Sequence, residues 1–176
     1  MTRSLALSLA LLSSAATAQP EAPVKLGALL LLKLVTYDAA FDTRGDGDFV
    51  LAVPYSKGRE ADAEALVKTL LEVETRRIKQ RPLVFRATPA DKADGEALLL
   101  SAALAPADVT GLLVRARERR QYTFGLSEAS AREGALLAVM PNEGKLQPVL
   151  NVSTARAIGA EFPASVLKLA RVVPGG

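Results

Sequence analysis

The short polar loop at residues 55–58 carries the side chains that are best suited to binding a ligand. Tyr55 and Ser56 offer hydroxyl groups, Lys57 offers an ammonium group, and Gly58 follows. The loop leaves an expected strand and enters an expected helix. Small ligands of open α/β sheets bind outside the carboxyl ends of strands, and helix N-termini favour anions. We therefore expect these four residues to form a ligand site, with an ordinary strand–helix turn as the alternative.

The conventional catalytic side chains are missing from this sequence. It contains no His and no Cys. Their absence excludes Ser–His triads, thiol catalysis and ordinary zinc or copper sites. Neither of the glycine-rich phosphate motifs, G-x-x-x-x-G-K-[ST] and G-x-G-x-x-G, occurs. Most carboxylates lie on expected helix faces or in turns, where solvation explains them. We expect a protein that is not an enzyme and has no catalytic residues, metal or cofactor.

Residues 42–48 (DTRGDGD) resemble a calcium-binding loop at first sight. The third loop position is Arg44, where an oxygen ligand is needed, and the twelfth is Val53, where a bidentate Glu belongs. A surface turn explains the segment better. The Arg-Gly-Asp triplet within it is known as an adhesion tripeptide, but chance in an Arg-rich chain explains it better.

Hydrophobic spacing indicates which elements hold these side chains in place. Apolar residues three and four apart indicate helices, and short apolar runs indicate strands. The expected helices span residues 24–37, 59–78, 106–117, 153–158 and 163–172, with 127–133 either helical or looped. The expected strands span residues 49–53, 83–87, 97–100, 122–126, 135–140 and 146–152. Their alternation predicts an α/β fold with a mostly parallel sheet and a late antiparallel hairpin at its edge.

The first eighteen residues have the pattern of a secretory signal peptide. One Arg precedes an apolar run, and residues 16–18 (ATA) offer the small-x-small pattern of a cleavage site. A membrane anchor is the alternative, but a spanning helix needs about 20 apolar residues, and Pro20 interrupts this run too early. We expect residues 1–18 to be removed by cleavage near Ala18/Gln19. The remaining chain is then periplasmic and does not itself span the membrane.

The composition of the remaining chain suits one domain. It is 49% hydrophobic overall, and a mature chain of roughly 160 residues is long enough to bury a core. The formal net charge of +3 is too small to indicate a nucleic-acid partner. A local cluster of arginines points in several directions on its expected helix, so a solvated surface explains it; the cluster comprises Arg115, Arg117, Arg119 and Arg120. We expect a single domain over residues 24–173.

Motifs near the two ends of the expected domain point to a known family. Residues 31–38 read LLKLVTYD, residues 151–157 read NVSTARA, and residues 162–173 read FPASVLKLARVV. In this order they resemble the YfiR/HmsC-type family of small periplasmic regulators. The resemblance implies a Rossmann-like three-layer α/β sandwich with no nucleotide and no catalysis. The cysteines that make some members redox-responsive are absent here, which excludes a disulfide switch.

The resemblance also implies a function in signalling. It implies that the protein, like the best-known members, docks on the periplasmic domain of an inner-membrane diguanylate cyclase and keeps the cyclase inactive. Release of the cyclase then raises cyclic di-GMP and promotes biofilm. A histidine kinase is the other sensor to consider. Docking predicts an exposed apolar patch. The candidates are Tyr37 and Phe41, after the first helix, and Phe162 and Leu167, near the last, with core packing as the alternative. The alternative function is a periplasmic small-ligand binding or sensor protein that uses residues 55–58. A structural role in the envelope also stays open.

Overall fold

The computed structural model describes residues 21–174. The expected signal peptide, residues 1–18, and its cleavage point near Ala18/Gln19 lie outside the described residues. The helices are α1 (Glu21–Val35), α2 (Glu60–Leu71), α3 (Pro106–Glu118), α4 (Glu128–Glu133), α5 (Val152–Ile158) and α6 (Ala164–Leu169), with 3-10 turns η1 (Phe41–Thr43) and η2 (Ala90–Lys92). The strands are β1 (Phe49–Tyr55), β2 (Arg77–Ile78), β3 (Arg81–Pro89), β4 (Ala97–Leu99), β5 (Tyr122–Gly125), β6 (Leu137–Asn142), β7 (Lys145–Asn151) and β8 (Arg171–Val173).

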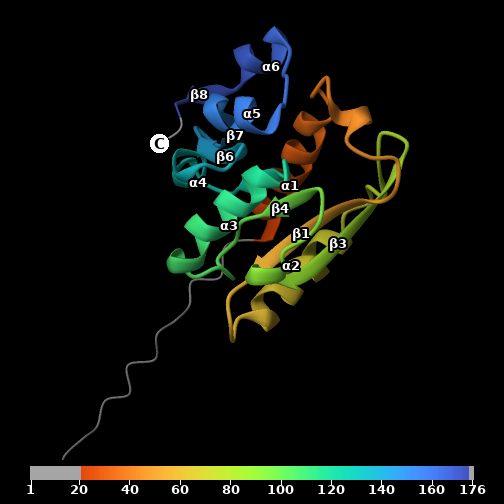
Figure 1. Cartoon of the computed structure of the whole chain (residues 1–176), viewed down its shortest axis with the longest axis vertical. Helices are drawn as coiled ribbons and strands as arrows, with labels where there is room; N and C mark the ends of the chain where they lie inside the picture. Colours follow the sequence, from red (N-terminus) through yellow and green to blue (C-terminus); the bar gives the residue numbers. More distant parts are fainter. Residues whose placement is uncertain (1–20, 175–176) are drawn as a thin grey trace, which may run out of the picture.

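The strands of the described chain form one mixed sheet in the order β2-β3-β1-β4-β5-β6-β7-β8. Figure 1 labels six of these strands, from β3 and β1 to β7 and β8. β3, β1, β4, β5 and β6 run parallel to one another, as do β7 and β8. The pairs β2–β3 and β6–β7 are antiparallel. The chain passes from β1 to β3 on one side and returns to β4 on the other, so the strand order reverses beside β1. The sheet confirms the predicted Rossmann-like α/β class.

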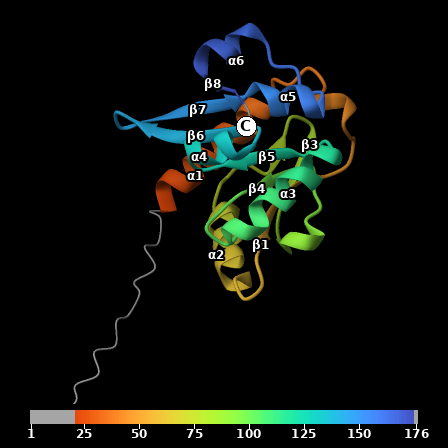
Figure 2. The same ribbon diagram turned by 60° about the vertical axis from the view of Figure 1, so that its left-hand side comes forward.

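Helices cover both faces of the sheet (Figure 2). α1 and α2 contact each other and pack on one face, where the larger core includes Leu31, Leu51 and Leu99. α3 covers the other face through a second cluster that includes Leu98 and Leu112. Because neighbouring residues of a strand point to opposite faces, β4 contributes Leu98 to one core and Leu99 to the other. This double burial explains why the central strands are continuous apolar runs.

Local sequence signals account for several helix ends. Pro106 opens α3, where its fixed φ suits the first helical turn. The Asn151 side chain accepts a hydrogen bond of 2.9 Å from the backbone N–H of Thr154 and caps α5. Gly159 ends α5 in the left-handed region, with φ of 69°. The two signals at the ends of α5 agree with the helix predicted over residues 153–158.

Three expected helices end earlier than their spacing predicts. The helix expected over residues 24–37 ends at Val35. The helix expected over residues 59–78 ends at Leu71, and the last two residues of that range form β2. The Arg76 guanidinium donates hydrogen bonds to the carbonyls of Leu71 and Val73 just after the helix. The helix expected over residues 163–172 ends at Leu169. The residues that follow it form β8 alongside β7. The predicted hairpin β6–β7 is present, but β8 and not the hairpin forms that edge of the sheet.

Candidate functional site

The four residues expected to bind a ligand lie together in one crevice. Tyr55, Ser56, Lys57 and Gly58 line a space of about 1010 Å³ at the carboxyl ends of β1 and β3. The remaining walls come from the first turns of α2, from η2 and from Asp108 in the first turn of α3. The crevice lies beside the reversal of strand order, where open α/β sheets bind their ligands.

Ser56 holds the crevice together and is not a free ligand group. Its hydroxyl donates a hydrogen bond to the Asp108 carboxylate and accepts one of 2.8 Å from the backbone N–H of Ala105. Its own backbone N–H donates to the carbonyl of Ala103 at 3.0 Å. Ser56 is buried, so these bonds tie the loop after β1 to the start of α3. The loop that follows β1 therefore has a fixed geometry.

The charge around the crevice is negative. Glu60, Glu64, Asp91 and Asp108 line it, against the single ammonium of Lys57. These carboxylates reverse the preference for anions that the helix N-terminus alone predicts. The positive end of α2 contributes only about 0.3–1 kcal/mol, whereas one carboxylate 4 Å from a unit charge contributes about 4 kcal/mol at a near-surface dielectric. The lining therefore favours a cation.

The Tyr55 hydroxyl is part of this electrostatic environment. It donates a hydrogen bond of 3.0 Å to the Glu60 carboxylate. Desolvation, that hydrogen bond and the charges of Glu60, Glu64 and Asp91 raise the pKa of Tyr55 above its ordinary value. The hydroxyl therefore stays neutral and acts as a hydrogen-bond donor to Glu60. Ala61, beside these groups, gives the wall an apolar portion.

Phe41 does not belong to an exposed patch, and the expectation that it does is wrong. Its side chain is fully buried, and its ring stacks on Phe49 at 5.6 Å and on Tyr122 at 6.5 Å between centroids. The polar turn that follows it in sequence folds Phe41 inward as part of η1. Phe162 is partly buried and packs against the larger core. Core packing, the alternative reading, therefore holds for Phe41.

Exposed apolar side chains instead gather on the C-terminal segment. Leu167, Leu169 and Val172 are 40%, 67% and 46% exposed, and Tyr37 is 46% exposed elsewhere on the surface. Leu169 borders a groove of about 600 Å³ between α1 and the β6–β7 hairpin. The apolar side chains that line this groove are Leu30, Leu34, Leu146, Pro148 and Leu169. Of the four predicted docking residues, Tyr37 and Leu167 are the exposed ones.

A buried polar cluster centred on Asp38 escaped prediction. Both carboxylate oxygens of Asp38 accept hydrogen bonds: Oδ1 from the backbone N–H groups of Ala40 and Glu161, at 3.0 and 2.7 Å, and Oδ2 from Arg44 Nε and the Tyr122 hydroxyl, at 3.2 and 2.7 Å. The Asp38 side chain is fully buried. This cluster joins the segment after α1 to β5 and to the segment after α5. The Asp in the LLKLVTYD motif was the one signal that could have pointed to it.

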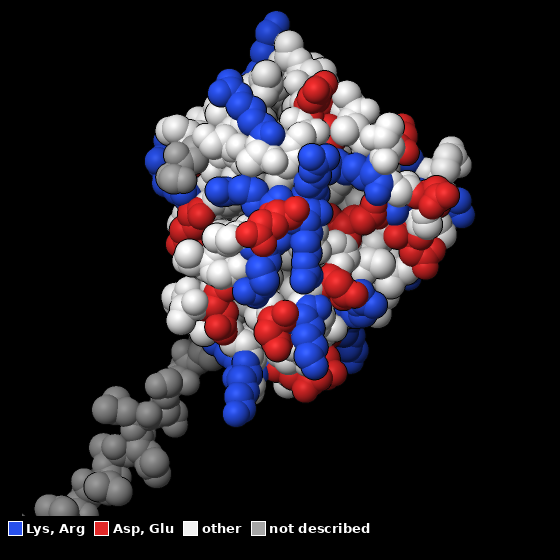
Figure 3. All heavy atoms as spheres, viewed as in Figure 1, with Lys and Arg blue, Asp and Glu red and all other residues white. Residues whose placement is uncertain are grey.

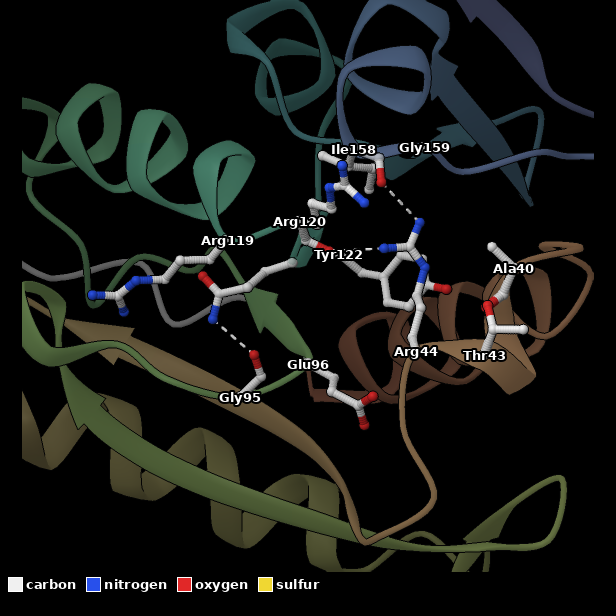
Figure 4. Close-up of a pocket in the computed structure, with 11 residues that line it drawn as sticks. Ala40, Thr43, Arg44, Gly95, Glu96, Arg119, Arg120, Tyr122, Ile158 and Gly159 are labelled. Atoms are coloured by element: carbon white, nitrogen blue, oxygen red, sulfur yellow. Dashed lines mark hydrogen bonds between the residues drawn. The ribbon is translucent and has the colours of Figure 1, made fainter.

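Arg44 extends this cluster to two helix ends. Its Nη1 and Nη2 atoms donate to the carbonyls of Arg120 and Ile158, both at 3.0 Å, and its guanidinium lies 4.6 Å from the centre of the Tyr122 ring. Arg44 thus neutralises the carbonyl ends of α3 and α5. A second, smaller hollow lies beside it at the amino ends of β4 and β5 (Figure 4).

Neither a metal centre nor a membrane span is found among the described residues. Over residues 21–174, no group of three or more His, Cys, Asp or Glu side chains is placed to hold a metal ion. The acidic side chains of the crevice thus surround it without converging on one point. Over the same residues, no helix combines the length and apolar character that crossing a membrane requires.

The fold and its crevice define a Rossmann-like α/β domain with a ligand-sized space at the strand ends. No protein-family model matches the chain, and no curated protein matches it. It is similar in structure to a conserved domain protein from Vibrio cholerae O1 biovar El Tor, with a TM-score of 0.58 and 18% identity over 85% of this chain and 60% of that one. It is also similar to the ABC domain from Streptococcus pneumoniae solved in complex with L-Trp, with a TM-score of 0.54 and 13% identity over 86% of this chain and 60% of that one. The chain thus spans three fifths of each neighbour, and the likeness establishes the fold.

Proposed function

We propose that this protein is a non-catalytic, periplasmic binding protein whose crevice takes a small ligand carrying an ammonium or other cationic group. The observation that carries this proposal is the crevice at the carboxyl ends of β1 and β3, where four carboxylates face one ammonium. Its volume of about 1010 Å³ is close to the upper end of the range for small-molecule sites. The solved neighbour from Streptococcus pneumoniae holds L-Trp, an amino acid with such a group, which supports the choice of ligand class.

Calorimetric titration tests this proposal. The probes are L-amino acids and aliphatic diamines, each paired with its deaminated analogue, at constant pH and ionic strength. We expect saturable binding of at least one amine and none of its analogue. Glu64→Gln should weaken that binding about tenfold, since a charge-assisted hydrogen bond contributes about 1.5–3 kcal/mol. Lys57→Ala should leave it equal or stronger, because it removes a repelling charge.

Glu74→Gln is the matched control, because Glu74 is an exposed carboxylate that does not line the crevice. It should leave the affinity unchanged. Equal losses in Glu64→Gln and Glu74→Gln would assign the binding to overall charge. An absence of saturable binding by every amine up to millimolar concentration would refute the proposal.

A second candidate function is supported by the exposed apolar segment at α6 and β8. We propose that this surface docks on the periplasmic domain of an inner-membrane sensor, a diguanylate cyclase or a histidine kinase, as the YfiR/HmsC-type resemblance implies. Leu167, Leu169 and Val172 are exposed within six consecutive residues, and Leu169 continues into the groove beside α1. Isolated surface apolar residues need no partner, but Leu169 joins the apolar lining of the groove, and an apolar groove of this kind suits one.

Site-specific photocrosslinking in living cells tests this second candidate. A photoreactive residue at position 169 should capture a membrane protein that contains a cyclase or kinase domain, identified by mass spectrometry. The control position is Leu71 on α2, which is 49% exposed and apolar but does not line the groove. Capture of the same protein from both positions, or of no membrane sensor from position 169, would contradict docking through this surface.

A further inference from the structure

The hollow at the amino ends of β4 and β5 differs in charge from the crevice at the other end of the sheet. It holds about 360 Å³, and its lining includes Arg44, Glu96, Arg119, Arg120 and Tyr122. Three of these side chains are guanidinium groups and one is a carboxylate. Figure 3 shows Lys and Arg side chains gathered around the middle of the face that carries α3 in Figure 1, with acidic side chains among them.

The carboxylates next to this hollow are already neutralised. Both oxygens of Glu96 accept hydrogen bonds from the Arg81 guanidinium. Asp38 is fully buried and bound to Arg44. By contrast, none of the ion pairs among residues 21–174 involves Arg119 or Arg120. Because the Arg119 side chain extends away (Figure 4) and donates to the carbonyl of Ala93 at 3.1 Å, the balance here is three guanidiniums against two carboxylates. This leaves an excess of one positive charge, on Arg120.

The carbonyl ends of α3 and α5 also face this hollow, and by themselves they would repel an anion. Arg44 removes that obstacle, because it donates to the carbonyls of Arg120 and Ile158 at 3.0 Å. Three hydrogen bonds and the Tyr122 ring hold its guanidinium in place. It therefore presents a fixed positive charge at the edge of the hollow.

Arg120 supplies a second, exposed guanidinium at the same place. Arg120 follows α3 with φ of 55°. Its backbone N–H donates to the carbonyl of Arg117 at 3.1 Å, and the backbone N–H of Gln121 donates to the carbonyl of Ala116 at 2.8 Å. These two bonds form a Schellman motif in which Arg120 takes the position that glycine usually occupies. In Figure 4 the side chains of Arg120 and Arg44 both extend toward Ile158, whereas that of Arg119 extends away. One fixed and one adjustable guanidinium thus border the same space.

We propose that this hollow binds the oxyanion group of a small molecule, a carboxylate or a phosphate, between Arg44 and Arg120. Guanidinium groups match such oxyanions with paired, charge-assisted hydrogen bonds. The site lies at the end of the sheet opposite the crevice, so it does not depend on the function proposed for the crevice. Arg44 is the fixed half of the site, and Arg120 closes on the bound group.

Binding of inorganic phosphate and of citrate, measured by calorimetry at constant ionic strength, tests this proposal. We expect saturable binding of at least one probe, and the comparison of the two distinguishes a phosphate from a carboxylate ligand. Arg120→Gly should raise the melting temperature, because glycine suits the positive φ. The same variant should bind the probe with about tenfold lower affinity, which is the loss expected for one charge-assisted hydrogen bond. A loss of affinity in a more stable variant cannot result from misfolding.

Arg132→Gln is the charge control, since Arg132 is an exposed arginine on α4 that does not line the hollow. It should leave the affinity unchanged. Equal weakening in Arg120→Gly and Arg132→Gln, or no saturable binding of either anion to the unaltered protein, would overturn the site.

Discussion

Replacing Asp38 by Asn should destabilise the fold more than any change to a surface carboxylate. The Asp38 carboxylate accepts four hydrogen bonds, two of them from Arg44 and Tyr122, and its side chain is fully buried. An Asn side chain offers one oxygen and one N–H₂ group, so one of the two donor pairs loses its acceptor. The Arg44 charge then remains without its carboxylate.

The expected cost is about 3 kcal/mol. Breaking a buried ion pair costs about 3–5 kcal/mol when the other charge stays buried. The lower end of this range of costs applies, because Arg44 keeps its hydrogen bonds to two carbonyls and its side chain is 13% exposed. For a domain of this size, each kcal/mol lowers the melting temperature by about 2–4 °C, so a decrease of roughly 10 °C is expected.

Urea unfolding followed by circular dichroism measures this cost as a shift of the midpoint. The matched control is Asp42→Asn, which removes an exposed carboxylate paired with Lys79 at 2.8 Å. Exposed pairs contribute about 0–1 kcal/mol, so the control should change the free energy of unfolding little. If Asp38→Asn costs no more than Asp42→Asn, the central role assigned to Asp38 is refuted.

The remaining predictions concern β5. Burial, followed by the hydrogen bond to Asp38, raises the pKa of Tyr122 above its ordinary 10.0. Above pH 10 the Tyr122 hydroxyl therefore ionises in the unfolded chain while it stays protonated in the folded one. The free energy of unfolding should then fall by about 1.4 kcal/mol per pH unit. The Tyr122→Phe variant should lack this fall in the free energy of unfolding above pH 10. If its pH dependence is identical to that of the unaltered protein, the role assigned to the Tyr122 hydroxyl is contradicted. Gly125→Ala would place a Cβ 2.3 Å from the Cβ of Ser130 and should cost about 3 kcal/mol in urea unfolding. Gly47→Ala, which meets nothing within 4 Å, should cost little, and equal costs would argue against the close packing at Gly125.

Local sequence patterns predicted the α/β class because each central strand is buried on both faces and each main helix keeps an apolar stripe. They failed where tertiary contacts decide the structure. The last three-residue strand continues the apolar spacing of α6, and only the open edge of β7 makes it a strand. Phe41 follows the same rule: Ala40 and Asp42 flank it in sequence, but its ring contacts are Phe49 on β1 and Tyr122 on β5.

The two candidate sites also differ in how much of each local sequence could predict. Residues 55–58 were predictable, because a general rule places ligands at the carboxyl ends of parallel strands. The negative charge of their crevice was not, since Asp91 and Asp108 reach it from other elements. The Asp38 cluster and the hollow beside Arg120 join residues as far apart as Asp38 and Glu161. Such long-range contacts leave no periodic trace in the sequence.

A chemical-shift titration of ¹⁵N-labelled protein with the tightest-binding amine tests the central proposal most directly. The crevice model predicts saturable shifts of the backbone amides of Lys57, Gly58 and Asp91, with no change for Gln121 at the opposite end of the sheet. Shifts confined to other surfaces, or none at Lys57, Gly58 and Asp91, would contradict the assignment of this crevice as a ligand site.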